Sequence, residues 1–300
     1  MKIGSTDIID TFAEAFSMQY TRLIVTAHDQ HWLDAAVREF TGFSSSVIAC
    51  DLEMGIESWL SPEETPDGRP GAAVLAFGFS KDALAKAVPN RVGQCVMTCP
   101  STSLFDGLPD ANARIPVGKH IRYFGDGYQK SKQIAGRRYW RIPVMDGEFL
   151  VEDKTGVSAG VGGGNLILQA TDQIAALDAA KRAVTAIQDV PGAITPFPGG
   201  VARSGSKVGS RYPGLKASTS DPYCPTLKGK VESQLVDGAN CVLEVVIDGV
   251  SEQAVAAATR AGVLAAAGDN VLAVGAGNYG GKLGKFHFHL RPLLAADAAC

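Results

Sequence analysis

Residues 241–268, CVLEVVIDGVSEQAVAAATRAGVLAAAG, contain the pattern that decides the fold. Residues 241–247 are apolar at six of seven positions, as in a strand buried within a sheet. Ser251 is a favourable N-cap, and the Ala-rich segment after it predicts a helix. The same order occurs at residues 165–187, where NLILQA predicts a strand, Thr171 a cap and the following segment a helix. Strand, cap and helix therefore form a repeated unit.

The first half of the chain contains the same elements. TRLIVTA (21–27) and AAVLAFGF (72–79) predict strands because they are short apolar runs. The first is followed by a predicted helix over residues 28–40. After the second, Ser80 caps a helix that we expect to end or kink at Pro89.

Two short matches connect the halves. LDAA at residue 33 recurs at residue 177, and FSKDALAKA at residue 79 corresponds to VSEQAVAAA at residue 250. The wider spacing of the second match predicts an insertion, for which residues 211–230 are the candidate. We therefore predict an α+β fold that arose by internal duplication of two ferredoxin-like (split βαβ) lobes with loop insertions. The predicted domains are a proximal lobe over residues 1–160 and a distal lobe over residues 161–300.

The composition is that of a globular protein with 46% hydrophobic and 20% charged residues. A net charge of -3 lacks the basic surface that binding to nucleic acid or to an anionic membrane would require. No apolar run approaches the ~18 residues of a membrane-spanning helix, and the N-terminal segment does not have the pattern of a signal peptide. The six cysteines do not suggest a disulfide framework in a chain of this length, so we expect a cytoplasmic protein.

Two glycine motifs match catalytic fingerprints by spacing alone. GAGNYG (275–280) fits a dinucleotide-binding loop, but a β-like segment follows it instead of a helix, which favours a turn. GVSAG (156–160) has the spacing of a nucleophile elbow around Ser158, but further glycines and a strand follow. A hairpin is the better interpretation, and a serine-type hydrolase using Ser158 is an alternative function.

The histidines and cysteines do not have metal-site spacing. His28 and His31 are three residues apart, and His287 and His289 share one face of a predicted strand. The two cysteines of CVMTC (95–99) are separated by three residues, whereas zinc and redox motifs use two. We therefore predict no metal ligands.

Glu244 lies within the apolar strand of residues 241–249. Burial of a carboxylate costs free energy because it loses its hydration. Strand alternation places Glu244 on one face with Val242 and Val246, while the apolar residues between them lie on the other. Glu244 therefore either faces solvent on an edge strand or has a function that needs a shielded carboxyl group.

A series of unusual loops occurs in a fixed order along the chain. They are DTFAEAF (10–16), PEETPDGRPG (62–71), RVGQCVMTCP (91–100), FGDGYQ (124–129), GEFLVED (147–153), PFPGG (196–200), SKVGS (206–210), ASTSDPYCPT (217–226) and GNYGGKLG (277–284). Together, from about residue 8 to residue 290, the chain resembles formylmethanofuran:tetrahydromethanopterin formyltransferases.

The resemblance implies an acyltransferase of one-carbon metabolism. It would move a formyl group between N-formylmethanofuran, or a bacterial analogue of that carrier, and N5 of tetrahydromethanopterin, through a tetrahedral intermediate. The carriers are co-substrates, and no prosthetic group is implied. The family also implies two ferredoxin-like lobes, a homotetramer, and an active site in a cleft that involves the lobes and a subunit contact.

The near-neutral charge resembles bacterial members, which are the formyltransferase subunit of a formyltransferase/hydrolase complex. Their partner is a zinc-dependent formylmethanofuran hydrolase, to which any zinc would belong. A non-catalytic scaffold subunit of such a complex is a further alternative. The tail LLAADAAC (293–300) lies beyond the family motifs.

The resemblance also assigns roles to residues. Glu244 matches the glutamate associated with transfer in the family, and a carboxyl group whose pKa is raised by an apolar site can carry a proton between two amines. Glycine-rich loops let backbone N–H groups approach a ligand, and lysines suit anionic carriers. The predicted substrate-binding residues are Gly163, Gly164, Asn165, Phe197, Gly199, Gly200, Lys207, Tyr223, Asn278, Tyr279 and Lys282.

Overall fold

The computed structural model describes residues 1–205 and 207–295. These residues form two compact units. Unit 2 is Met18–Gly160, and unit 1 combines residues 1–17 with the described residues from Val161 onward. Unit 1 thus includes the first 17 residues, which the predicted division at residue 160 had placed with the first half.

Strand pairing explains why the N-terminus belongs to unit 1. Strand β2 (Thr6–Ile8) pairs with β16 (Val271–Gly275), and the first residues of β3 (Phe12–Thr26) pair with β17 (Phe286–His289). Sequence analysis identified only the second half of β3, over residues 21–27. The earlier half is a strand because β17 provides its hydrogen-bond partners.

Unit 2 is built on four antiparallel strands in the order β4–β5–β3–β6. Helices α1 (Gln30–Thr41) and α2 (Lys81–Arg91) pack on this sheet and are N-capped by the side chains of Asp29 and Ser80. Pro89 does not end α2 but lies inside it. The strands are β4 (Glu53–Leu60), β5 (Gly71–Gly78) and β6 (Ser103–Asp106), with β3 as given above.

Beyond β6 the sheet of unit 2 continues through β10, β9 and β8. The bounds are β8 (Lys130–Ile134), β9 (Arg137–Val144) and β10 (Gly147–Glu152). The remaining short elements of unit 2 are β7 (Ala113–Ile115), which pairs with residues 155–157, and α3 (Val117–Ile121).

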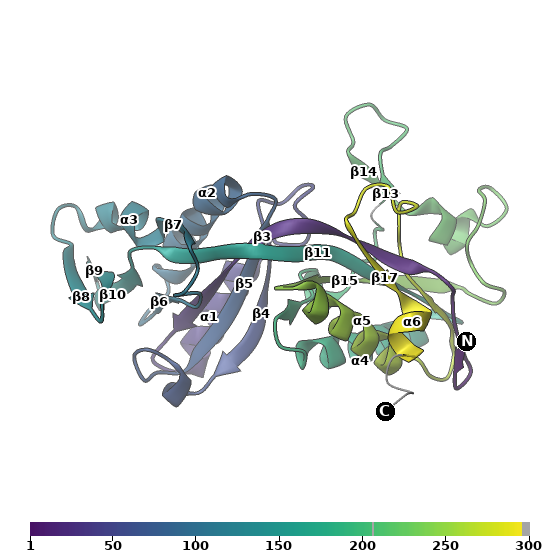
Figure 1. Ribbon diagram of the computed structural model, residues 1–300, viewed down its shortest axis with the longest axis horizontal. Coiled ribbons are helices and arrows are strands. Elements are labelled where there is room, and N and C mark those ends of the chain that lie inside the picture. Colours follow the sequence, from purple (N-terminus) through teal and green to yellow (C-terminus); the bar gives the residue numbers. More distant parts are fainter. Residues whose placement is uncertain (206, 296–300) are drawn as a thin grey trace. The chain divides into compact units, whose positions relative to one another are not determined.

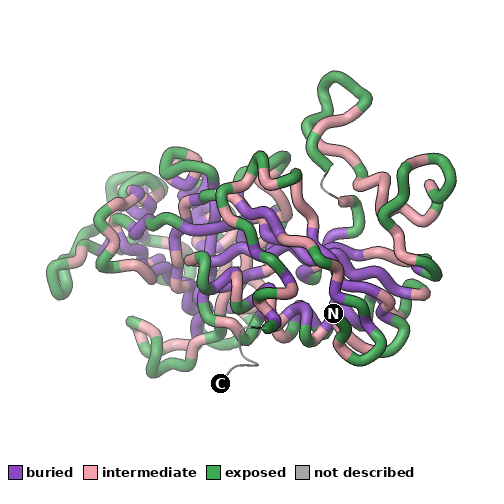
Figure 2. Tube along the Cα trace, turned by 45° about the vertical axis from the view of Figure 1, so that its right-hand side comes forward, coloured by how far each residue is buried: buried purple, intermediate pink, exposed green. Residues whose placement is uncertain are grey.

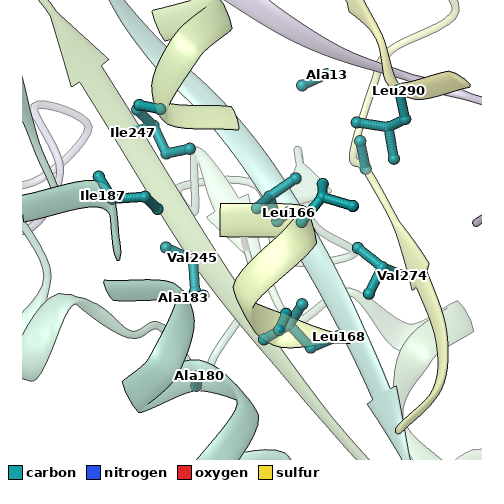
Figure 3. Packing of buried hydrophobic residues seen from close by; sticks show 14 of the residues in the cluster. Ala13, Leu166, Leu168, Ala180, Ala183, Ile187, Val245, Ile247, Val274 and Leu290 are labelled. Atoms are coloured by element: carbon teal, nitrogen blue, oxygen red, sulfur yellow. The ribbon is translucent and has the colours of Figure 1, made fainter. Parts of the chain in front are cut away.

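Unit 1 has the strand order β12–β15–β11–β16–β2–β1. Helices α4 (Gln173–Gln188) and α5 (Glu252–Ala266) lie together on one side of β11 and β15 (Figure 1). Leu166 of β11 and Val245 of β15 point toward Ile187 of α4 in the apolar core (Figure 3). The strands are β1 (Lys2–Ile3), β11 (Thr155–Ala170), β12 (Ala193–Ile194) and β15 (Cys241–Gly249), and the chain continues from β17 into α6 (Leu290–Ala295).

Strand β11 corrects the predicted hairpin at the glycine-rich segment. It runs without a turn through GVSAGVGGGN, with a bulge between Val161 and Gly164. Glycine in a strand interior often marks such a bulge, and Gly163 has a φ of +83°. Ser158 therefore lies within a strand and not at a nucleophile elbow. This removes the structural basis for a serine hydrolase.

The predicted insertion forms an extended loop region of unit 1. A two-stranded hairpin, β13 (Lys207–Val208) with β14 (Ala217–Ser218), projects from the sheet on the side away from α4 and α5 (Figure 1). The tip of this hairpin is exposed, whereas the strands of the sheet are largely buried (Figure 2). The predicted cap Thr171 is also corrected, because Asp172 caps α4. The last residues of the C-terminal tail, 296–300, lie outside the described part.

Candidate active site

Glu244 lies in the middle of β15, on the face opposite the apolar core. Its neighbours Leu243 and Val245 belong to that core, as strand alternation predicts. Glu244 itself is only 4% exposed. Its backbone exchanges hydrogen bonds with Ala202 at 2.8 and 3.0 Å, while Ile167 of β11 pairs with it on the other side. The interpretation as a solvent-facing residue on an edge strand is therefore wrong.

Asn165 holds the Glu244 side chain. The backbone N–H of Gly277 donates to Asn165 Oδ1 at 2.8 Å, and Asn165 Nδ2 donates to Glu244 Oε1 at 2.5 Å. The first bond fixes the orientation of the amide, so its donor end must face the carboxyl group. A Cβ on residue 277 would lie 2.5 Å from Asn165 Nδ2, so any other residue here would displace the amide that holds Glu244.

Glu244 and Asn165 line a cavity of about 480 Å³, which is large enough for the reacting end of an organic carrier. The predicted residues Lys207, Tyr223, Asn278 and Tyr279 also line it. Six of the twelve predicted site residues thus lie around one cavity. The other lining residues are Ile9, Asp10, Thr11, Ile167, Ser220, Pro222, Gln234, Gly275, Ala276 and Gly277.

The polar side chains of this cavity have identifiable partners. Burial, and then the negative charge of Glu244, raise the pKa of Tyr223, so its hydroxyl remains a hydrogen-bond donor at neutral pH. Lys207 Nζ binds Asp221 Oδ1 at 2.6 Å, and this hydrogen bond lowers the pKa of Asp221. Asn278 Nδ2 donates to Thr11 Oγ1 at 3.0 Å, which ties the loop to the N-terminal segment.

A second, smaller cavity of about 40 Å³ adjoins Glu244. It shares Ile167, Ser220 and Tyr223 with the larger one. The rest of its lining is the segment 202–205, Thr219, Cys224, Val242 and Leu243. Its volume corresponds to no more than a few water molecules. Glu244 is therefore positioned between a cavity of carrier size and a cavity of solvent size.

The remaining six predicted residues do not line the larger cavity. Gly164 packs against α5, where a Cβ would lie 3.2 Å from Val255, and Gly163 donates its N–H to Asp248 at 2.8 Å. A Cβ on Gly200 would lie 2.7 Å from Val184 of α4. These glycines thus have packing and turn roles. The others are Phe197, which is half-buried, and Gly199 and Lys282, which are exposed.

Two functional contributors were missed by sequence reasoning. Gln169 is fully buried on the Glu244 face of β11, where it accepts from Val236 N at 2.9 Å and donates to Gln234 O at 3.2 Å. It anchors the loop that closes one wall of the cavity. Glu14 is 1% exposed and accepts hydrogen bonds from the loop that carries Tyr279. The available signal was a polar residue within a strand, the same signal that identified Glu244.

In the described ranges, no group of three or more His, Cys, Asp or Glu side chains could hold a metal ion. The same part of the chain has no helix that is long and apolar enough to cross a membrane. The glycine-rich turn at residues 276–284 leads into β17 and not into a helix, which confirms the interpretation of GAGNYG as a turn.

Comparison with known proteins identifies the family. The model described as formylmethanofuran-tetrahydromethanopterin formyltransferase matches residues 1–144, and the model described as the proximal lobe of that family matches residues 147–293. The chain belongs to this family. The predicted family is thereby confirmed. The term proximal lobe belongs to the second model, so our prediction reversed the two lobe names.

The similarity to individual members extends over nearly the full length. The chain is 52% identical to the formylmethanofuran--tetrahydromethanopterin formyltransferase of Rhodopirellula baltica, covering 98% of this chain and 93% of that protein. It is 50% identical to one subunit of the formyltransferase/hydrolase complex of Methylorubrum extorquens, covering 99% and 98%. The crystal structure of that complex with methylofuran matches with a TM-score of 0.94 at 49% identity, covering 98% of each chain.

Proposed function

We propose that this chain transfers a formyl group between an N-formylmethanofuran-type carrier and N5 of tetrahydromethanopterin. The observation that carries the proposal is a buried glutamate, Glu244, held by Asn165 at the wall of a cavity of about 480 Å³ in a member of the formyltransferase family. The carriers are co-substrates. A relative has been crystallised with methylofuran, so a bacterial furan carrier is the expected partner of the pterin.

Glu244 is proposed to carry the proton that the transfer requires. The attacking amine nitrogen adds to the formyl carbon and gives its proton to the Glu244 carboxylate. Glu244 then gives this proton to the leaving nitrogen as the C–N bond to that nitrogen breaks. The formyl group changes carrier, and Glu244 finishes as it began. A side chain placed for such proton transfer contributes about 10²–10⁴-fold to the rate.

The other cavity residues have supporting roles in this proposal. The Tyr223 hydroxyl, kept protonated by burial and by the charge of Glu244, donates to the formyl oxygen as it gains negative charge. Lys207 forms an ion pair with Asp221 at the edge of the cavity, and it attracts the anionic parts of the carriers. Lys282 is exposed, and its role in carrier capture remains a prediction.

We also propose that the two units arose by duplication of one ferredoxin-like lobe. The support is a common strand order: β6–β3–β5–β4 in unit 2 corresponds to β16–β11–β15–β12 in unit 1. The caps correspond as well. Aspartate caps the first helix of each lobe, at Asp29 and Asp172, and serine caps the second, at Ser80 and Ser251. The sequence matches that begin at residues 33, 79, 177 and 250 overlap these same helices.

The assembly is part of the proposal. We expect a cytoplasmic homotetramer that joins a formyltransferase/hydrolase complex with a zinc-dependent hydrolase subunit. The Methylorubrum extorquens relative is named as a subunit of such a complex, which supports a partner. Exposed apolar side chains on the projecting hairpin, Val208, Tyr212 and Leu215, support a contact with another chain.

The test is formyl transfer by the purified full chain, from formylmethanofuran to tetrahydromethanopterin, followed by the change in pterin absorbance. The proposal predicts transfer that a serine-directed covalent inhibitor leaves unchanged. The same assay on the assembled complex separates a catalytic subunit that needs its partners from a scaffold. Absence of transfer in both preparations would contradict the proposed function.

A further inference from the structure

Glu14 lies on β3 in the part of that strand that pairs with β17, and its carboxylate is surrounded by backbone donors. Oε2 accepts from the N–H groups of Tyr279 at 2.6 Å and Gly281 at 2.9 Å. Oε1 accepts from Leu283 at 2.7 Å and Gly284 at 2.5 Å. Four N–H groups of one six-residue loop thus converge on one buried side chain.

This arrangement is that of an anion-binding loop whose anion belongs to the protein itself. Successive backbone N–H groups that point inward form a concavity for negative charge. Burial by itself would raise the pKa of Glu14, but the hydrogen bonds from Gly284, Tyr279, Leu283 and Gly281 outweigh it and lower the pKa. Glu14 is therefore ionised at neutral pH, and it occupies donors that we had expected to face a substrate.

The glycines of the loop fit this carboxylate closely. Gly280 and Gly281 have φ values of +70° and +72°, which glycine adopts without strain. A Cβ on Gly284 would lie 2.6 Å from Glu14 Cγ, so only glycine permits the approach. The pattern of GNYGGKLG therefore matches the shape of the Glu14 side chain.

This loop begins at the wall of the Glu244 cavity, where Tyr279 is its first residue. Gly277, Asn278 and Tyr279 line this cavity, and Gly277 also orients Asn165. The Tyr279 ring lies 6.2 Å from the ring of Phe16, two residues beyond Glu14 on β3. Removal of the Glu14 carboxylate would take the acceptor away from four partly buried N–H groups, and the loop would leave this arrangement.

We propose that Glu14 is a positioning residue for formyl transfer, a built-in anion around which residues 279–284 fold so that Tyr279, and with it the adjoining Gly277 and Asn278, is held in the cavity wall beside Glu244. It acts on the loop and not on the reacting atoms. Glutamine cannot replace it, because its amide has one acceptor oxygen and would present N–H groups to N–H groups. Aspartate is one methylene shorter and cannot reach all four donors. The proposal rests on the proposed formyl transfer for its kinetic effect.

The experiment is chemical rescue of the full-length Glu14→Ala protein with acetate. The vacated space is lined by four N–H donors and matches a small carboxylate. We expect the KM for at least one carrier to rise about tenfold to hundredfold, with a smaller change in kcat, because only a fraction of the protein has the competent loop. Acetate at millimolar concentration should lower that KM towards the wild-type value, whereas neutral acetamide should not.

Two controls keep the outcome decisive. Glu148→Ala removes a surface carboxylate that pairs with Arg141, and acetate should not change its kinetics. Thermal melting provides a readout that does not depend on activity: acetate should raise the Tm of Glu14→Ala protein and not that of the wild type. If Glu14→Ala does not fold, Glu14→Gln takes its place for the KM and kcat measurements.

The proposal would be overturned if the Glu14 variant had the KM of the wild type. It would also be overturned if acetate changed the KM and Tm of variant and wild type equally. If the wild type itself transfers no formyl group, the failure concerns the proposed function. The melting experiment would then still decide whether the loop is built around the Glu14 anion.

Discussion

Glu244 and Glu14 are buried glutamates on strands of the same unit, and they are held in contrasting ways. Glu14 accepts four backbone N–H groups of one loop, which stabilise its charge. Glu244 accepts a hydrogen bond from a side-chain amide and lines two adjoining cavities. Backbone donors keep the Glu14 carboxylate ionised and occupied, whereas a carboxylate beside a cavity can accept a proton from a substrate. The surroundings of a buried glutamate, and not its residue type, therefore separate a structural anion from a proton carrier.

The largest expected effect comes from Glu244→Gln. The substitution keeps the size of the side chain and a carbonyl oxygen for Asn165, but it removes proton transfer. We expect the single-turnover rate of formyl transfer to fall about 10²–10⁴-fold. Circular dichroism and Tm should remain close to those of the wild type. A fully active, folded Glu244→Gln protein would remove Glu244 from the mechanism.

Glu14→Gln should lower stability as well as raise the KM. Unpaired N–H groups around residue 14 should lower the free energy of unfolding by about 3 kcal/mol at pH 7, measured by urea denaturation. In the folded protein the loop N–H groups outweigh burial and lower the pKa of Glu14. The contribution of Glu14 to the free energy of unfolding is therefore fully present above its unfolded-state pKa of about 4.3, and it is lost as the pH falls through the pKa of the folded protein. The difference between wild type and variant should therefore narrow below about pH 4. A difference that does not depend on pH would refute the role of charge.

Tyr223→Phe should have the smallest of these effects. It removes one hydroxyl from the cavity wall and leaves the ring in place. Loss of one donor to a developing oxyanion should lower the transfer rate about tenfold, with little change in Tm. An unchanged rate would show that Tyr223 serves packing alone.

Sequence reasoning succeeded where the signal is local. The apolar runs at residues 72–79 and 241–249 are strands, and Ser80 and Ser251 cap helices, because these features depend on neighbouring residues. It failed at GVSAGVGGGN, since glycines that usually mark a turn are here accommodated in one long strand with a bulge. The conformation of that segment is decided by strands distant in the sequence.

The site residues, too, could be predicted only where the signal is local. Glu244 was identified because a charge within an apolar strand is visible in the sequence, and the family motif pointed to Asn278 and Tyr279. Glu14 is an equally unusual residue, but its partners begin 265 residues later, and their N–H groups carry no sequence signature. Backbone donors were therefore assigned to a substrate when an internal carboxylate already occupied them.

The pH dependence of single-turnover transfer by Asn165→Asp protein tests the central claim most directly. This substitution keeps an acceptor for Gly277 N–H but places a second carboxyl group at hydrogen-bond distance from Glu244, and two neighbouring carboxylates resist ionising together. If Glu244 carries the proton, the apparent pKa in the pH profile of the transfer rate should rise by about one unit or more. In Glu14→Gln protein this apparent pKa should equal that of the wild type. Coincident profiles for wild type and Asn165→Asp would contradict the assignment of proton transfer to Glu244.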